Sequence, residues 1–170
     1  MARALMVIAP DTFRDEEYAH PKEVLEGRGV LIDTASLRRG TCRGRFGLTA
    51  EAGLTLAEAD AGDYDAVIFV GGGGAEVYFD DPGAHALAVR AFEAGRTVAA
   101  ICIAPSILAR AGLLSGRRVT AFSSREHDLV AHGATFTGAP VEIDGPFITA
   151  NGPDAAYDFG EAIAGAIAPR

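Results

Sequence analysis

Short apolar runs alternate along the chain with segments in which apolar residues recur at helical spacing. Residues 65–70 and 97–101 are runs without alternating polar positions, as is typical of strands buried on both faces of a parallel sheet. Residues 15–27 and 81–95 have the periodicity of amphipathic helices. The alternation predicts an α/β sandwich, with a mostly parallel sheet, helices on both faces and ligands at the carboxyl ends of the strands.

Weaker patterns complete this sandwich. Residues 37–56 are rich in Arg, Gly and Thr and predict a β-excursion, in which Cys42 is expected to be exposed. Without a linker or repeat, the 170 residues predict a single domain, 1–170. A closing helix after Asn151 is expected to bury Tyr157, Phe159, Ile163 and Ile167. The remaining predicted strands are 3–9, 30–34, 118–122, 135–137, 141–143 and 147–150.

Charge and composition restrict the partners. The net charge of −8 argues against nucleic acid, because no basic surface is available to release counterions. No apolar run approaches the roughly 20 residues of a membrane helix, and two cysteines do not make a disulfide framework. We therefore expect a cytoplasmic protein without membrane or nucleic-acid partners. Four scattered histidines lack metal-ligand spacing, so neither a metal nor a cofactor is expected.

Cys102 lies between the strand 97–101 and a helical pattern that begins at Pro105. A residue at such a turn lies at the carboxyl edge of the sheet, beside free N–H groups of the helix start. These groups lower a thiol pKa from ~8.5 to roughly 3.5–7.5, which predicts a nucleophile that is largely thiolate near neutral pH. The alternative is a small buried core cysteine.

Glu17 falls on the apolar side of the first helix, with Pro21 and Leu25, when residues are placed at 100° intervals. Glu16 instead shares a face with His20. An inward carboxylate is costly unless it is protonated or hydrogen-bonded, so Glu17 is a candidate site residue. The alternative is an acid at a helix start that the helix dipole favours.

Four glycines, residues 71–74, follow the strand 65–70 and precede Glu76. The Lys-Ser/Thr pair of a P-loop is missing, so a tight turn that exposes backbone N–H groups is the better interpretation.

Three motifs in combination resemble the ThiJ/PfpI superfamily, which includes the Parkinson-disease-associated deglycase and the PfpI-type intracellular proteases. They are Phe13-x-Asp15-x-Glu17-x-x-x-Pro21, Asp65-Ala-Val-Ile-Phe-Val-Gly71-Gly72 and Ala99-Ala-Ile-Cys-x-Ala-Pro105. The resemblance covers nearly the whole chain. It implies a flavodoxin-like three-layer sandwich with Cys102 as nucleophile on a nucleophile elbow and Glu17 hydrogen-bonded to its sulfur. The amides of Gly72 and Ile103 would form the oxyanion pocket.

The resemblance also implies a homodimer or a hexamer, for which Tyr18, Phe46 and Tyr78 would supply apolar surface. We expect Glu17 to be protonated beside the sulfur, so that the pair shares one negative charge.

Two departures from the family affect function. Ile103 replaces the histidine that follows the cysteine in the peptidase branch, and Phe122 stands where the other branch has its histidine. Glu76 matches the acid that supports the histidine of the peptidase branch, and it is a possible accessory residue of the site, as is His20. We expect a cysteine-dependent stress enzyme acting on small reactive carbonyls, glyoxalase III-like or deglycase-like, because an aldehyde needs no prior activation.

Two alternatives remain. A PfpI-type peptidase or amidase would require His20, or a histidine of another subunit, to reach Cys102. A non-enzymatic redox sensor or chaperone-like stress protein would use the same thiolate.

Overall fold

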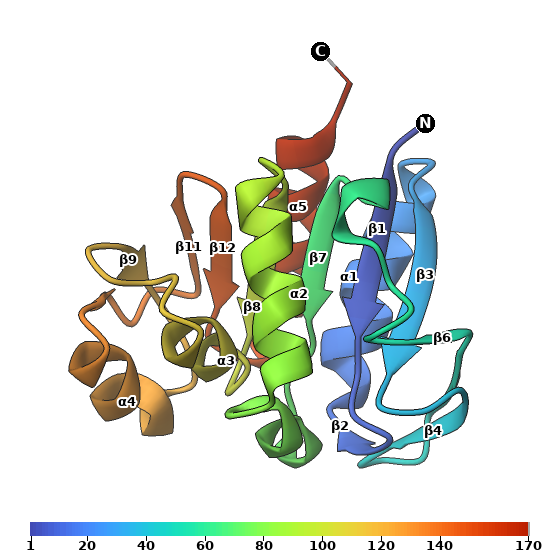
Figure 1. Ribbon diagram of the computed structural model, residues 1–170, viewed down its shortest axis with the longest axis horizontal. Helices are drawn as coiled ribbons and strands as arrows, with labels where there is room; N and C mark the ends of the chain where they lie inside the picture. The colour runs from blue at the N-terminus through green and yellow to red at the C-terminus, as the bar shows by residue number, and fades with distance from the viewer. Residues whose placement is uncertain (170) are drawn as a thin grey trace.

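The computed structural model describes residues 1–169, and its centre is a seven-stranded sheet between layers of helices (Figure 1). The strand order is β11-β12-β8-β7-β1-β3-β6, and every neighbouring pair is parallel except β11 with β12. The strands are β1 (Arg3–Val7), β3 (Leu31–Ser36), β6 (Leu54–Thr55), β7 (Ala66–Phe69), β8 (Thr97–Ile101), β11 (Val141–Asp144) and β12 (Phe147–Ala150). This confirms the expected flavodoxin-like α/β sandwich.

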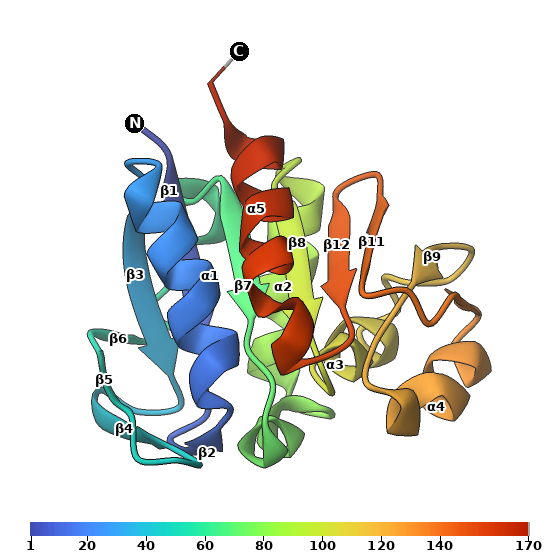
Figure 2. The same cartoon turned by 180° about the vertical axis from the view of Figure 1, so that it is seen from behind.

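Helices cover both faces of the sheet. Helices α1 and α5 pack side by side on one face (Figure 2), and α2 and α3 lie on the other face, seen in Figure 1. The short helix α4 packs against α3 at the β12 side of the molecule. The helices are α1 (Asp15–Gly27), α2 (Pro82–Glu93), α3 (Pro105–Arg110), α4 (Glu126–Ala131) and α5 (Ala156–Ile167).

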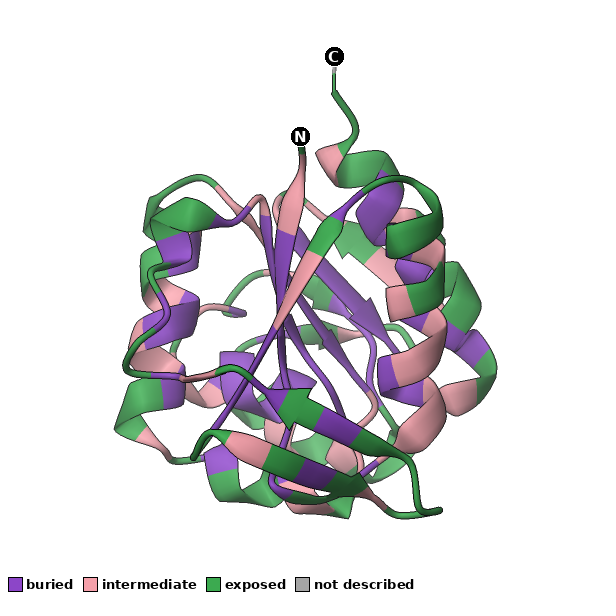
Figure 3. Ribbon diagram, turned by 90° about the vertical axis from the view of Figure 1, so that its right-hand side faces the viewer, coloured by how far each residue is buried: buried purple, intermediate pink, exposed green. Residues whose placement is uncertain are grey.

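The central strands β1, β7 and β8 are buried almost throughout, which explains their uninterrupted apolar sequence (Figure 3). Side chains alternate between the two faces of each strand. Leu5 and Val7 therefore belong to the core beneath α2, whereas Ala4 and Met6 belong to the core beneath α1 and α5. The hairpin turn predicted at Asp144-Gly145 joins the antiparallel strands β11 and β12.

The predicted excursion contains β4 (Gly40–Gly44) and β5 (Thr49–Ala52), which join β2 (Asp11–Phe13), a strand that the sequence pattern does not predict, in a second, three-stranded sheet of order β2-β4-β5. It lies at the carboxyl end of the main sheet (Figure 1). The expectation that Cys42 is exposed is wrong: Cys42 is only 1% exposed, because β4 packs against the core beside Tyr18 and Ala50.

Three further expectations need correction. Tyr18 and Tyr78 are buried, because each hydroxyl finds an internal partner, and Phe46 alone of the three expected dimer residues is exposed. Tyr157 is 47% exposed, and it contacts His20 and Glu23 of α1 rather than the core. The strand predicted over 118–122 is limited to β9 (Arg118–Val119), which pairs with β10 (Thr135–Phe136) in a separate sheet.

Candidate active site

Cys102 occupies a sharp turn between β8 and α3. Its φ angle is +65°, a left-handed conformation that costs energy for a residue with a side chain. The turn is held on both sides, because the Cys102 amide donates to the Ala150 carbonyl at 2.9 Å and its carbonyl accepts from the Phe122 amide at 2.8 Å. The expected nucleophile elbow is therefore present, with its strain imposed by strand β12 and the segment after β9.

Glu17 lies in the first turn of α1 and is fully buried, as the helical spacing predicts. A Cβ added at Gly71 would overlap the Glu17 carboxylate and would lie 2.7 Å from the Cβ of Cys102. The missing side chain at Gly71 thus brings the carboxyl group and the thiol together. Neither Glu17 oxygen has a partner in full hydrogen-bonding geometry among the described residues, and the nearby thiol and the Gly71 amide both act on its pKa.

Two backbone amides act on the pKa of the Cys102 thiol. The N–H groups of Gly72 and Ile103 interact with the Cys102 thiol and favour its anionic form. Gly72 has a φ angle of +95°, and a Cβ there would collide with the backbone of Phe13 and Arg14. Only glycine fits this close crossing, which aims the Gly72 amide at the sulfur.

The charge state of the pair differs from the expected free thiolate. Burial raises the pKa of Glu17 to about 7. Burial and the neighbouring Glu17 raise the pKa of Cys102 to about 12, against the smaller opposing effect of the two amides. Helix α3 begins only at Pro105 and is short, so its dipole does not compensate. Between these values the pair carries one negative charge and one proton, as expected for two coupled groups.

The two accessory candidates do not join this pair. His20 stacks on Tyr157 of α5, with ring centroids 4.0 Å apart, and Glu76 is exposed. In the part of the chain that the structure describes, no hydrogen bond connects a histidine to Cys102: His85 contacts the Phe79 carbonyl, and His132 the Asp128 carbonyl. Ile103 and Phe122 leave the site without an imidazole.

The segment before α1 contributes residues that the sequence patterns did not single out. Thr12, with a φ angle of +56°, is the second strained non-glycine residue of the described chain, and it lies against the turn of residues 72–74. Arg14 precedes Glu17 by one helical turn, and its backbone amide donates to the Gly71 carbonyl at 3.0 Å. The sequence offers one indication of Arg14 as a site residue: it is a basic residue inside the motif that contains Glu17.

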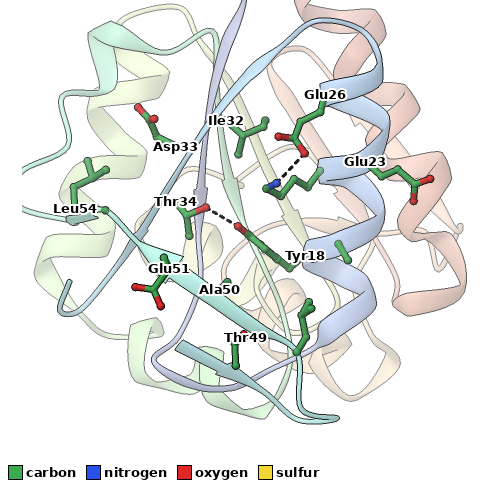
Figure 4. Close-up of a pocket in the computed structure, with 14 residues that line it drawn as sticks. Tyr18, Glu23, Glu26, Ile32, Asp33, Thr34, Thr49, Ala50, Glu51 and Leu54 are labelled. Atoms are coloured by element: carbon green, nitrogen blue, oxygen red, sulfur yellow. Dashed lines mark hydrogen bonds and ion pairs between the residues drawn. The ribbon is translucent and has the colours of Figure 1, made fainter. Parts of the chain in front are cut away.

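Two hollows lie near these elements. One, of about 750 Å³, lies between α1 and β5, where Tyr18 bonds Thr34 at 2.7 Å; its rim is acidic and it does not include Cys102 (Figure 4). The other, of about 390 Å³, is lined by Phe122, Asn151 and neighbouring residues, and its lining does not include Cys102 either. Among residues 1–169, no cluster of three or more potential metal ligands occurs, and no helix is long and apolar enough to cross a membrane.

Comparison with known proteins agrees with this geometry. A deglycase of Thermococcus kodakarensis is 31% identical over 153 residues, which is 90% of this chain and 92% of that protein. An uncharacterised protein of Methanocaldococcus jannaschii is 37% identical over 162 residues, covering 94% of this chain and 79% of that protein. The crystal structure of a ThiJ/PfpI domain protein from Brachyspira murdochii superposes with a TM-score of 0.95 at 33% identity, over 97% of this chain and 95% of that one. The model of the DJ-1/PfpI family matches residues 2–166, and the chain therefore belongs to the DJ-1/PfpI family.

Proposed function

We propose that this protein is a cysteine-dependent enzyme that acts on small reactive carbonyl compounds, with glyoxalase III-like or deglycase-like activity. The observation that carries the proposal is the buried pair of Cys102 and Glu17, which holds one negative charge beside two backbone amides. This site has a nucleophile, a proton carrier and donors for an oxyanion, but no imidazole. The name of the deglycase relative supports the same chemistry.

With methylglyoxal the reaction begins when the Cys102 sulfur attacks the aldehyde carbon. A C–S bond forms, and the carbonyl electron pair moves to oxygen, where the amides of Gly72 and Ile103 donate hydrogen bonds. The thiol proton passes through Glu17 to this oxygen, which gives a hemithioacetal.

The same carboxylate then completes an internal redox exchange. Glu17 removes the proton from the former aldehyde carbon and returns it to the former ketone carbon, while the hydroxyl proton of the hemithioacetal moves to the former ketone oxygen, which produces a lactate thioester. The aldehyde carbon is oxidised and the ketone carbon reduced, so no external oxidant is needed. Water hydrolyses the thioester to lactate and restores the Cys102 thiol.

The missing imidazole favours carbonyls over peptides. Cleavage of an amide requires a general acid that protonates a poor leaving group, and relay through one shared proton suits addition to an aldehyde better.

Lactate formation from methylglyoxal tests the proposal. We expect turnover by the wild type, its loss in Cys102→Ser, and its retention in Cys42→Ala, the matched control for the second free cysteine. Wild-type turnover no greater than that of Cys102→Ser contradicts the proposal. Cleavage of fluorogenic peptides that depends on Cys102 would favour the peptidase alternative, and oxidation by peroxide without either turnover would favour a redox sensor.

We also propose a homodimer that acts in a reducing cytoplasm, where Cys42 and Cys102 remain thiols. Phe46, 63% exposed, supports an apolar contact between copies. Light scattering at micromolar concentration tests the assembly, and a monomer would contradict it.

A further inference from the structure

Arg14 lies at the start of α1, hydrogen-bonded to the glycine turn that flanks Cys102. It is the N-cap residue of α1, and its carbonyl accepts from the Glu17 amide at 3.1 Å, which places it one turn before the buried acid. Its own amide bonds the Gly71 carbonyl, and its backbone fills the space left by the missing side chain of Gly72. Arg14 therefore cannot move independently of the segment that presents the amide of Gly72 to the sulfur.

The guanidinium group of Arg14 is held in place by two neighbours. Its Nε donates to Glu16 Oε2 at 2.5 Å, and its Cζ lies 4.9 Å from the centre of the Phe46 ring. Phe46 is fixed in turn, because the Asp15 carboxylate accepts from the amides of Phe46 and Leu48 at 3.0 and 2.9 Å. The side chain of Arg14 is only 33% exposed, so this cation is partly desolvated and pre-positioned.

The charge of Arg14 acts on the catalytic pair. The guanidinium opposes the rise in the pKa of Glu17. The hydrogen bond to Glu16 is the main cause that raises the pKa of Arg14, and Glu17 and Cys102 raise it further by smaller amounts. The backbone geometry agrees, because the Arg14 amide bonds the carbonyl of Gly71, where an added Cβ would lie 2.7 Å from the Cβ of Cys102. The chain as a whole is acidic, so an approaching anion meets repulsion except where a local cation offsets it.

We propose that Arg14 is a specificity-determining residue that binds a carboxylate, or a comparable anionic group, on the carbonyl substrate next to the carbon that Cys102 attacks. The preferred substrates are then carboxylate-bearing aldehydes or aldehyde adducts rather than neutral ones. This inference rests on the proposed function, since it assigns the substrate class of the same site.

Two alkylating reagents of nearly equal shape test the inference without any turnover. Iodoacetate is an anion and iodoacetamide is neutral, and both attack the same Cys102 sulfur. The ratio of their rates, normalised to free cysteine, therefore cancels any change in the amount of thiolate. Modification of the full-length protein is followed by mass spectrometry of the peptide that contains Cys102.

We expect Arg14→Gln to lower this ratio about 5-fold, the effect of one partly screened charge at short range. Arg14→Lys should retain most of the ratio. Glu16→Gln should raise it, because Glu16 neutralises the guanidinium in the wild type. Arg45→Gln is the matched control, since Arg45 stacks on the same Phe46 ring at 5.7 Å.

An equal ratio in the wild type and Arg14→Gln would overturn the inference, as would an equal fall in Arg45→Gln. The proposed function is tested separately. Lactate formation with a ratio that ignores Arg14 would refute the anion preference alone, whereas an Arg14-dependent ratio without turnover would refute the carbonyl reaction alone.

Discussion

The buried Glu17 should make the stability of the fold depend on pH with a known sign. Its pKa is about 7 in the folded protein and 4.5 when exposed, so the folded state holds a proton that the unfolded chain releases near pH 4.5. A raised pKa means that the stabilisation by the protonated group is complete below pH 4.5 and is lost as the pH rises through about 7. At 1.36 kcal/mol per pKa unit, the loss is about 3 kcal/mol of the free energy of unfolding.

Glu17→Gln isolates this effect, because glutamine keeps the shape of the protonated acid but does not ionise. Urea denaturation of the wild type and the variant at pH 4.5, 6 and 8 gives their difference in the free energy of unfolding. We expect the difference to change by about 3 kcal/mol in favour of the variant between pH 4.5 and 8. Glu93→Gln, at an exposed helical carboxylate, is the control for the removal of a charge.

A difference that stays constant across this pH range would refute the reasoning. It would mean that Glu17 ionises alike in the folded and unfolded chains, and is therefore not buried beside the thiol. The comparison is made between variants, because carboxylates such as Glu58 and Asp128, whose pKa values are lowered, give the wild type an opposite pH dependence elsewhere in the chain.

Three further predictions concern the same region. The rate at which iodoacetamide alkylates Cys102 should increase with pH with a midpoint near pH 7, where the pair loses its first proton. In Glu17→Gln the midpoint of this pH-rate profile should rise by at least about one pH unit. Gly71→Ala should lower the free energy of unfolding by about 3 kcal/mol and abolish turnover, because the new methyl group would overlap the Glu17 carboxylate. Urea denaturation measures the loss of stability, and the lactate assay measures the loss of turnover. Asp15→Ala should remove the hydrogen bonds that hold the turn containing Arg45, so that trypsin cleaves after Arg45 faster than in the wild type. Equal cleavage rates would count against the role of Asp15 in fixing this turn.

Much of the fold could be predicted because its sheet is buried on both faces. Every residue of 66–69 in β7 and of 98–101 in β8 is apolar, which distinguishes these runs from loops. Helix α1 matches its predicted range, 15–27. Pro21 lies inside this helix, where the carbonyl of Glu17 loses its usual partner without ending the helix. The strand at 118–122 was predicted too long, because only Arg118 and Val119 find a partner strand.

Burial in the excursion could not be predicted, because it depends on tertiary packing. Cys42 lies in a strand with exposed neighbours, and local sequence does not reveal that one face of β4 packs on the core. The same limit applies to the tyrosines. Tyr18 is buried because Thr34 lies 2.7 Å from its hydroxyl, and Tyr78 because the Ile8 carbonyl lies 2.8 Å away. Such partners are distant in sequence and come together only in the folded protein.

The charge state of Cys102 shows why residue identity alone does not determine the chemistry of this site. A strand-to-helix turn suggests a lowered thiol pKa, yet burial and the Glu17 carboxylate outweigh the amides of Gly72 and Ile103. The sulfur is therefore activated by its partner: above about pH 7 the pair has lost one proton, and the remaining proton is shared between Cys102 and Glu17. A thiol with a neighbouring carboxylate and a thiolate with a neighbouring acid are kinetically equivalent. In the proposed reaction, such a site adds sulfur to an electrophilic carbonyl and returns the same proton to the oxygen. The residues Ile103 and Phe122, which cannot act as a general acid, are therefore the reason why the proposed function assigns to this site electrophiles that are reactive without an added acid.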